Sequence, residues 1–176
     1  YNKIDKKVWN DQYKELITKV QQSQNDYEYY KMLQKYCATL KDGHTNIYLP
    51  KHLEEQELVT MFGNYRIVLQ NINGHAIVVK INVSKKDVLP VGSEIIEING
   101  MTTAYYANQH VRPYISSSTT YVLDDLTISN LLRGLVGTKY VVRYKKPNGD
   151  IMEIELIHNR SVETEMYPTE IKKNNT

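Results

Sequence analysis

Apolar positions in the first 40 residues predict two amphipathic helices. From residue 5 to 24 they recur at spacings of three and four, which places them on one helical face. They are Val8, Trp9, Tyr13, Leu16, Ile17 and Val20. A second helix is predicted from Asn25, because Asn25 followed by Glu28 is a capping-box pattern. Its apolar positions are Tyr29, Leu33, Tyr36, Cys37 and Leu40. The polar joint at residues 22–25 is short, so we expect an antiparallel helical hairpin.

The pattern changes to alternation after the predicted hairpin. Residues 45–49 alternate before Pro50 and predict one short strand, followed by a charged connector. Further strands are predicted at 58–62, 65–70, 75–83, 94–98, 139–144 and 151–157. Asn-Gly pairs at 73–74, 99–100 and 148–149 favour tight turns, since asparagine and glycine accept a positive φ.

The stretch from 102 to 135 lacks strand alternation and predicts two helical segments. Pro113 and the serine run 116–118 separate these segments. The whole pattern predicts an α+β fold, in which a helical hairpin precedes a partly open β-barrel with a helical insert. We expect the domains to be residues 1–54 and 55–165, with 166–176 as a tail or the start of a linker. The polar end at 172–176 is expected to fray.

Composition and charge narrow the classes of partner and cofactor. The formal net charge is +2, which provides no broad field to attract nucleic acid. No apolar run approaches the roughly 20 residues of a transmembrane helix. The single cysteine and five dispersed histidines lack metal-ligand spacing, so we predict no metal and no cofactor. Because the chain begins at Tyr1 rather than methionine, we expect it to be cut from a longer polypeptide.

The turn Asp42-Gly43-His44-Thr45 carries the most pointed chemistry. An imidazole is the usual general base near neutral pH, so His44 is a candidate catalytic residue. The same four residues also fit a helix C-cap, with Gly43 left-handed and the Asp42 and Thr45 side chains bonded to local backbone. Both interpretations can hold together.

Other candidate nucleophiles are weaker. Cys37 takes a core-facing helical position, where cysteine behaves as a small inert hydrophobe. The hydroxyls of residues 116–120 lack a nucleophile-elbow pattern, and a polar run between helices is typical of a loop. We therefore predict no complete catalytic centre in this chain.

The most specific string is residues 91–100, Val-Gly-Ser-Glu-Ile-Ile-Glu-Ile-Asn-Gly. It resembles the Gly-Asp-x-Ile-x-x-Ile-Asn-Gly segment of PDZ domains, with Ser93 at the position of the aspartate. Together with Leu40-Lys41-Asp42-Gly43-His44-Thr45 after a helical hairpin, it resembles the front half of the C-terminal processing (tail-specific) serine peptidases, in their tricorn-like branch. Supporting matches are the serine run 116–118 and the segment around Asn148-Gly149-Asp150. The resemblance spans nearly the whole chain.

The resemblance implies a function for the turn and for one strand edge. His44 would be the general base of a serine peptidase whose nucleophile and oxyanion donors lie in a following α/β domain. The PDZ-like domain would bind a peptide or unfolded protein by strand addition. The expected binding residues are Phe62, Gly63, Tyr65, Ile67 and Leu69. By the same resemblance the protein would be exported, to the periplasm or cell envelope.

Two alternatives stay open. In the first, the chain is a stand-alone peptide-binding or adaptor module without peptidase activity. In the second, the insert at 105–132 fills the PDZ-like groove, and the chain is structural or regulatory.

Overall fold

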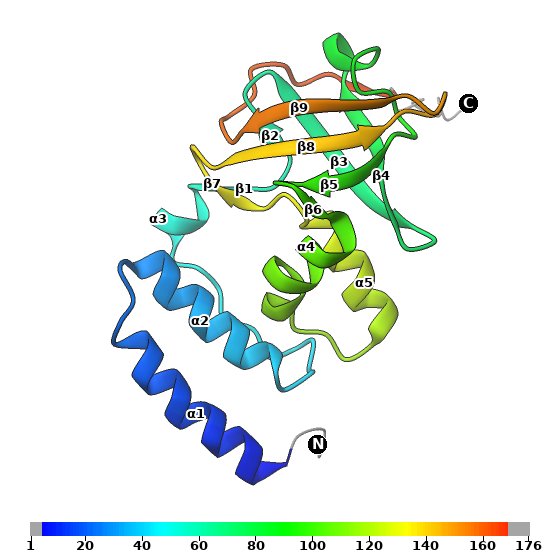
Figure 1. Cartoon of the computed structure of the whole chain (residues 1–176). Coiled ribbons are helices and arrows are strands. Elements are labelled where there is room, and N and C mark those ends of the chain that lie inside the picture. Colours follow the sequence, from blue (N-terminus) through cyan, green and yellow to red (C-terminus); the bar gives the residue numbers. More distant parts are fainter. Residues whose placement is uncertain (1–4, 169–176) are drawn as a thin grey trace, which may run out of the picture. The chain divides into compact units, whose positions relative to one another are not determined.

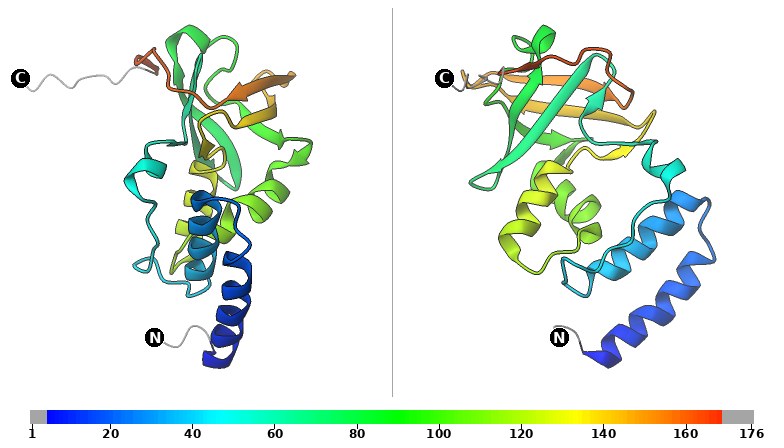
Figure 2. Two further views of the ribbon diagram at one scale, coloured as in Figure 1. Left: turned by 90° about the vertical axis from the view of Figure 1, so that its left-hand side faces the viewer. Right: turned by 180° about the vertical axis from the view of Figure 1, so that it is seen from behind.

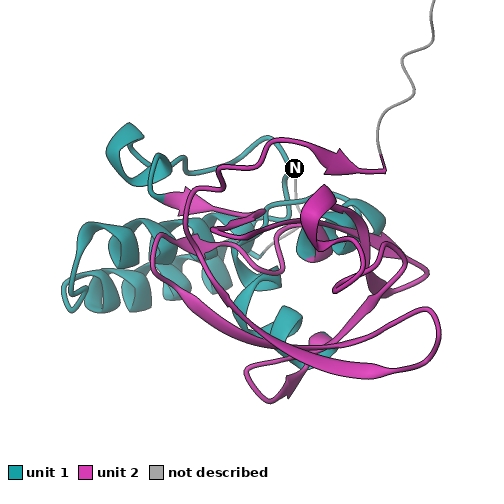
Figure 3. Cartoon of the chain, turned by 90° about the horizontal axis from the view of Figure 1, so that it is seen from above, with its two compact units in different colours: residues 1–56, 104–127 teal, residues 57–103, 128–176 magenta. Residues whose placement is uncertain are grey.

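A computed structural model describes residues 5–168 of the chain (Figure 1). Its contacts divide the chain into two compact units, coloured separately in Figure 3. Residues 1–56 and 104–127 form one, called the helical unit here, and residues 57–103 and 128–176 form the other, the sheet unit. The predicted frayed end at 172–176 lies outside the described residues.

The helical unit begins with α1 (Lys6–Val20) and α2 (Asp26–Ala38), both started by side-chain caps. The Asp5 carboxylate accepts hydrogen bonds from the first amides of α1, and the Asn25 side chain accepts one from Glu28 N at 2.9 Å. The Glu28 carboxylate in turn accepts from Gln24 N at 2.8 Å. Both helices therefore start where the sequence pattern predicts.

An aromatic contact joins α1 to α2. Trp9, near the start of α1, stacks on Tyr36, near the end of α2, with ring centroids 5.1 Å apart. Tyr13 lies 6.1 Å from the same ring. Because early α1 meets late α2, the two helices run antiparallel, as expected for the hairpin. Burial raises the pKa of the Tyr36 hydroxyl, since desolvation disfavours the phenolate.

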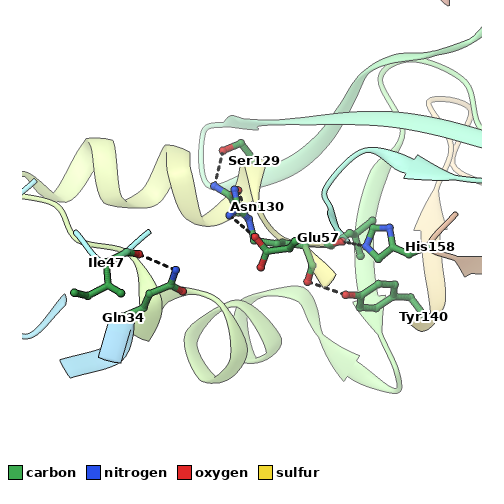
Figure 4. Close-up of polar contacts among 9 residues, drawn as sticks. Gln34, Ile47, Glu57, Ser129, Asn130, Tyr140 and His158 are labelled. Atoms are coloured by element: carbon green, nitrogen blue, oxygen red, sulfur yellow. Dashed lines mark hydrogen bonds and ion pairs between the residues drawn. The ribbon is translucent and has the colours of Figure 1, made fainter. Parts of the chain in front are cut away.

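The chain from Thr45 to Pro50 contains no strand, which corrects the strand predicted at 45–49. Hydrogen bonds from side chains, and not from a neighbouring strand, hold this segment. Gln34 Nε2 donates to Ile47 O at 3.0 Å (Figure 4), and Asn46 Nδ2 donates to Gly43 O at 2.9 Å. The short helix α3 (Lys51–Glu54) follows, within the predicted charged connector.

The predicted helical insert is confirmed as α4 (Thr103–His110) and α5 (Thr120–Ser129). A 3₁₀ turn, η2 (Arg112–Tyr114), lies between them and contains Pro113. In the helical unit, the Lys31 Nζ of α2 lies 4.5 Å from the centre of the Tyr114 ring, so α2 packs near this turn.

The sheet unit holds a curled antiparallel sheet with the strand order β2-β3-β4-β5-β8-β9. These strands are β2 (Met61–Phe62), β3 (Tyr65–Ile72), β4 (His75–Asn82), β5 (Glu94–Ile98), β8 (Lys139–Lys145) and β9 (Ile151–Ile157). Shorter strands pair at its margins: β6 (Met101–Thr102) with β5, β10 (Met166–Tyr167) with β4, and β1 (Glu57–Leu58) with β7 (Gly134–Leu135). The 3₁₀ turn η1 (Val83–Lys85) follows β4. The α+β class is confirmed.

Of the three predicted Asn-Gly turns, two form with both residues at positive φ, whereas at 148–149 only Gly149, at 97°, has a positive φ. Asn73 and Gly74 have φ values of 54° and 87° between β3 and β4, and Asn99 and Gly100 have 51° and 75° between β5 and β6. Asn99 also accepts a hydrogen bond from Val141 N through its side chain, at 2.9 Å, so this turn is tied to β8.

Alternate residues of these strands form the core. Val78, Ile81, Ile98 and Val142 have no exposed surface. Full burial of each such side chain contributes about 1.5–3 kcal/mol. The segment after β9 returns to β2, where Phe62 and Asn159 form a parallel bridge and Gly63 N donates to Asn159 O at 3.0 Å. Figure 2 shows the curled sheet from two further sides.

His158 fastens this closure from inside the core. Its side chain is fully buried, with Nδ1 2.8 Å from Met61 O and Nε2 2.6 Å from Leu132 O (Figure 4). The ring also stacks on Phe62, with centroids 4.4 Å apart. One side chain thus joins β2, the segment before β7 and the end of β9.

One predicted strand divides into two. Residues 58–62 were expected to be continuous, but a bend at residues 59–60 separates β1 from β2. The two halves pair with different strands, β1 with β7 and β2 with β3. Alternation alone does not reveal such a change of partner.

Candidate functional site

The turn after α2 is organised around the Asp42 carboxylate. Its Oδ1 accepts a hydrogen bond from His44 N at 3.2 Å, and its Oδ2 accepts one from the Thr45 hydroxyl at 2.8 Å. These bonds, the backbone one first, hold the pKa of the Asp42 carboxyl below its usual value. In its ionised form, the Asp42 carboxylate therefore fixes the backbone of the turn.

The His44 imidazole is exposed to solvent. Its side chain is 94% exposed, and its Nδ1 lies 3.4 Å from Asp42 Oδ1. That separation is longer than a strong hydrogen bond. The backbone of His44 is held by Asp42, while its ring is open to solvent.

The left-handed residue of this turn is Lys41, not Gly43 as predicted. Lys41 has a φ of 52°, and α2 has already ended at Ala38. The chain therefore reverses two residues earlier than a Gly43 cap requires. The predicted bond between the Asp42 side chain and local backbone forms. The Thr45 hydroxyl, which was also predicted to bond to backbone, donates to the Asp42 carboxylate instead.

The serine run lies against this turn within the helical unit. A Cβ atom added to Gly43 would sit 3.9 Å from Ser117 Cα and from Ser118 Oγ. Ser117 is buried, and its Oγ donates to Thr119 O at 2.9 Å, so this hydroxyl is occupied in the loop.

Burial raises the pKa of the Cys37 thiol, which disfavours the reactive thiolate.

The residues expected to bind peptide lie around β2 and β3, mostly facing the core. Phe62, Ile67 and Leu69 are 4%, 2% and 6% exposed, so their side chains pack inside the sheet unit. Gly63 N donates to Asn159 O at 3.0 Å and Ile67 N to Thr60 O at 2.8 Å. Tyr65 is half-buried, and its ring lies under Lys85 Nζ at 5.2 Å.

Sequence reasoning missed the partners that engage this segment. Asn159 and Asn82 come from distant positions, and Asn82 Oδ1 accepts from Arg66 N at 2.9 Å. No local pattern marks an asparagine as the partner of a backbone amide far away in sequence. The amides of Gly63, Arg66 and Ile67 are therefore used within the sheet unit.

Residues 5–168 provide neither a metal-ligand cluster nor a membrane-spanning helix. No group of three or more His, Cys, Asp or Glu residues there could hold a metal ion. Within the same range, every helix is too short or too polar to span a bilayer.

Comparisons with known proteins place the fold. No protein-family model matches the chain, and no curated protein does. A crystal structure of mature CPAF is similar, with a TM-score of 0.53 and 16% identity over 86% of this chain and 30% of that chain. Mature CPAF complexed with lactacystin gives 0.47 and 14% over 73% and 24%, and the photosystem II D1 C-terminal processing protease gives 0.35 and 15% over 80% and 35%.

These similarities concern the fold, because each identity is low. The chain spans about a quarter to a third of the length of each matched chain, as the shares of 24%, 30% and 35% show. In fold, the chain is distantly similar to mature CPAF.

Proposed function

We propose that this chain is the front portion of a serine endopeptidase of the C-terminal processing type, comprising a helical hairpin that carries the general base and a PDZ-like peptide-binding domain. The observation that carries the proposal is the presentation of His44. Asp42 holds the backbone of the turn, while the imidazole is 94% exposed. This is what a base requires if its serine is supplied by another part of the protein.

The proposed chemistry assigns His44 two proton transfers. The imidazole takes the proton from a serine hydroxyl as that oxygen attacks the peptide carbonyl, and later gives a proton to the leaving amine. The nucleophile and the oxyanion donors belong to a following α/β domain. Distant fold similarity to mature CPAF, and the order of hairpin, turn and curled sheet, support this assignment.

Peptide binding is proposed at the edge of β3, through its backbone. The side chains of Ile67 and Leu69 are buried, and the amides of Gly63 and Ile67 already have partners. Among the described residues, β3 pairs with β4 alone from Val68 to Gln70. An extended peptide added there would gain main-chain hydrogen bonds, as in other strand additions. The substrate is a peptide or unfolded protein, and the proposed location is the periplasm or cell envelope.

A serine-directed covalent probe tests the proposal. A fluorophosphonate should label the complete translated polypeptide at a serine outside residues 1–176 and leave the isolated 176-residue chain unlabelled. If the complete polypeptide cleaves no peptide and takes no label, the peptidase assignment is wrong. Peptide binding without cleavage would then favour the adaptor module.

A further inference from the structure

The helical unit contains an open concavity of about 570 Å³ between the end of α2, η2 and the start of α5. We propose that it binds the C-terminal carboxylate of a peptide together with the apolar side chains next to that carboxylate. The inference goes beyond the proposed function and does not require His44 to act as a base. The volume of the concavity is within the range of ordinary ligand sites.

The charged walls of the concavity have a single sign. Among the described residues, its ionisable lining residues are Lys35, Lys41 and Arg112, and none of the lining side chains is acidic. Lys35 and Lys41 are exposed, whereas Arg112 is half-buried. Thr120, the first residue of α5, also lines the concavity, and a helix start adds positive potential. The ligand should therefore carry a negative charge.

Arg112 is held in a defined position. Its NH1 pairs with Asp124 Oδ1, and Asp124 belongs to α5 within the same unit. A guanidinium has five N–H donors, so Arg112 can bind a second carboxylate while this pair stays intact. The pair thus fixes the cation at the site.

The rest of the lining selects among anions. Half-buried apolar residues, Pro113, Ile115 and Leu123, form part of the wall. A free phosphate would bury none of this apolar surface and so would lack the roughly 25 cal/mol per Å² that its burial contributes to binding. The lining also lacks aromatic rings on which a nucleotide base could stack. A carboxylate attached to apolar side chains can contact both the basic and the apolar residues of the lining.

The site is distinct from the β3 edge of the sheet unit and adjoins the His44 turn. Lys41 precedes Asp42 directly, and Gly43 lies against Ser117 and Ser118, both of which line the concavity. A peptide end bound here would be held by the helical unit alone.

Titration with matched peptides tests the inference. A pentapeptide ending in two leucines with a free carboxyl group should shift the backbone NMR signals of residues 117–120. The amide of the same peptide should bind at least tenfold more weakly, since the charge is removed. Binding should weaken with added salt because the charges are near solvent.

Two variants localise the effect. Lys35→Gln should weaken binding about threefold to tenfold, whereas Lys14→Gln, on the exposed face of α1, should leave it unchanged. Equal binding of acid and amide, or no binding of either, overturns the inference. Signal shifts confined to β3 also overturn it, and they would leave the proposed PDZ-like binding standing.

Discussion

The Thr45 hydroxyl donates to Asp42 Oδ2 at 2.8 Å, while Asp42 Oδ1 accepts from the His44 amide. The carboxylate thus holds both residues that follow Gly43. The turn is organised by an acidic side chain and not by the glycine. Its geometry should therefore depend on the charge of Asp42.

Asp42 should titrate below its usual pKa of 3.8. Its folded pKa is lowered, so its stabilisation is present above 3.8 and is lost as pH falls through the folded value. Carboxyl-carbon NMR of the 176-residue chain measures the midpoint. Thr45→Val should move it back toward 3.8, because one donor to the ionised form is removed. A wild-type midpoint at or above 3.8 contradicts this account.

Glu163 should give a second acid-sensitive contribution, in the sheet unit. The side-chain hydrogen bond from Asn82, followed by bonds from Ser84, lowers the pKa of the Glu163 carboxyl from 4.5. Glu163→Gln should therefore be less stable than wild type above pH 4.5, and the difference should vanish below the folded pKa. Urea unfolding at pH 7 and pH 3 measures both. A difference that grows toward low pH would show that these bonds do not favour the ionised form.

His158→Phe should destabilise the chain by about 2–4 kcal/mol. Phenylalanine can keep the stacking on Phe62 but has no ring N–H to donate to Met61 O or Leu132 O, the carbonyl oxygens that face the two ring nitrogens of His158. His52→Phe, at an exposed position on α3, is the control and should change stability little. Equal effects of the two variants in urea unfolding would mean that His158 does not fasten the sheet.

Gly134→Ala should destabilise by about 1–3 kcal/mol through overpacking. The added Cβ would meet Tyr140 Oη at 2.6 Å, and that hydroxyl already donates to Arg133 O at 2.9 Å. Gly43→Ala is the matched control, since its nearest neighbours would be 3.9 Å away. Thermal unfolding should show a lower melting temperature for Gly134→Ala than for wild type. For Gly43→Ala the melting temperature should be unchanged or slightly higher.

Local patterns predicted the elements that depend on local physics. The helix starts at Asp5 and Asn25, and the turns at residues 73–74 and 99–100, follow from capping and positive φ. The left-handed residue was assigned to Gly43 because glycine favours that conformation, but the earlier end of α2 placed it at Lys41.

Contacts between distant residues could not be predicted in this way. Gln34 binds Ile47 where a strand was expected, and Asn159 engages Gly63 from far along the chain. The basic concavity is likewise assembled from α2 and from η2 with the start of α5, which are separated by the whole first part of the sheet unit. Residue types in sequence do not specify such pairings, because tertiary packing selects them.

Peptide cleavage by the complete polypeptide carrying His44→Ala tests the central claim most directly. Loss of a general base predicts a fall in kcat of about 10²- to 10⁴-fold, while His52→Ala should retain wild-type activity. Circular dichroism of both variants checks that the fold is kept, as expected for a side chain that is 94% exposed. Wild-type kcat in a folded His44→Ala protein would contradict the account.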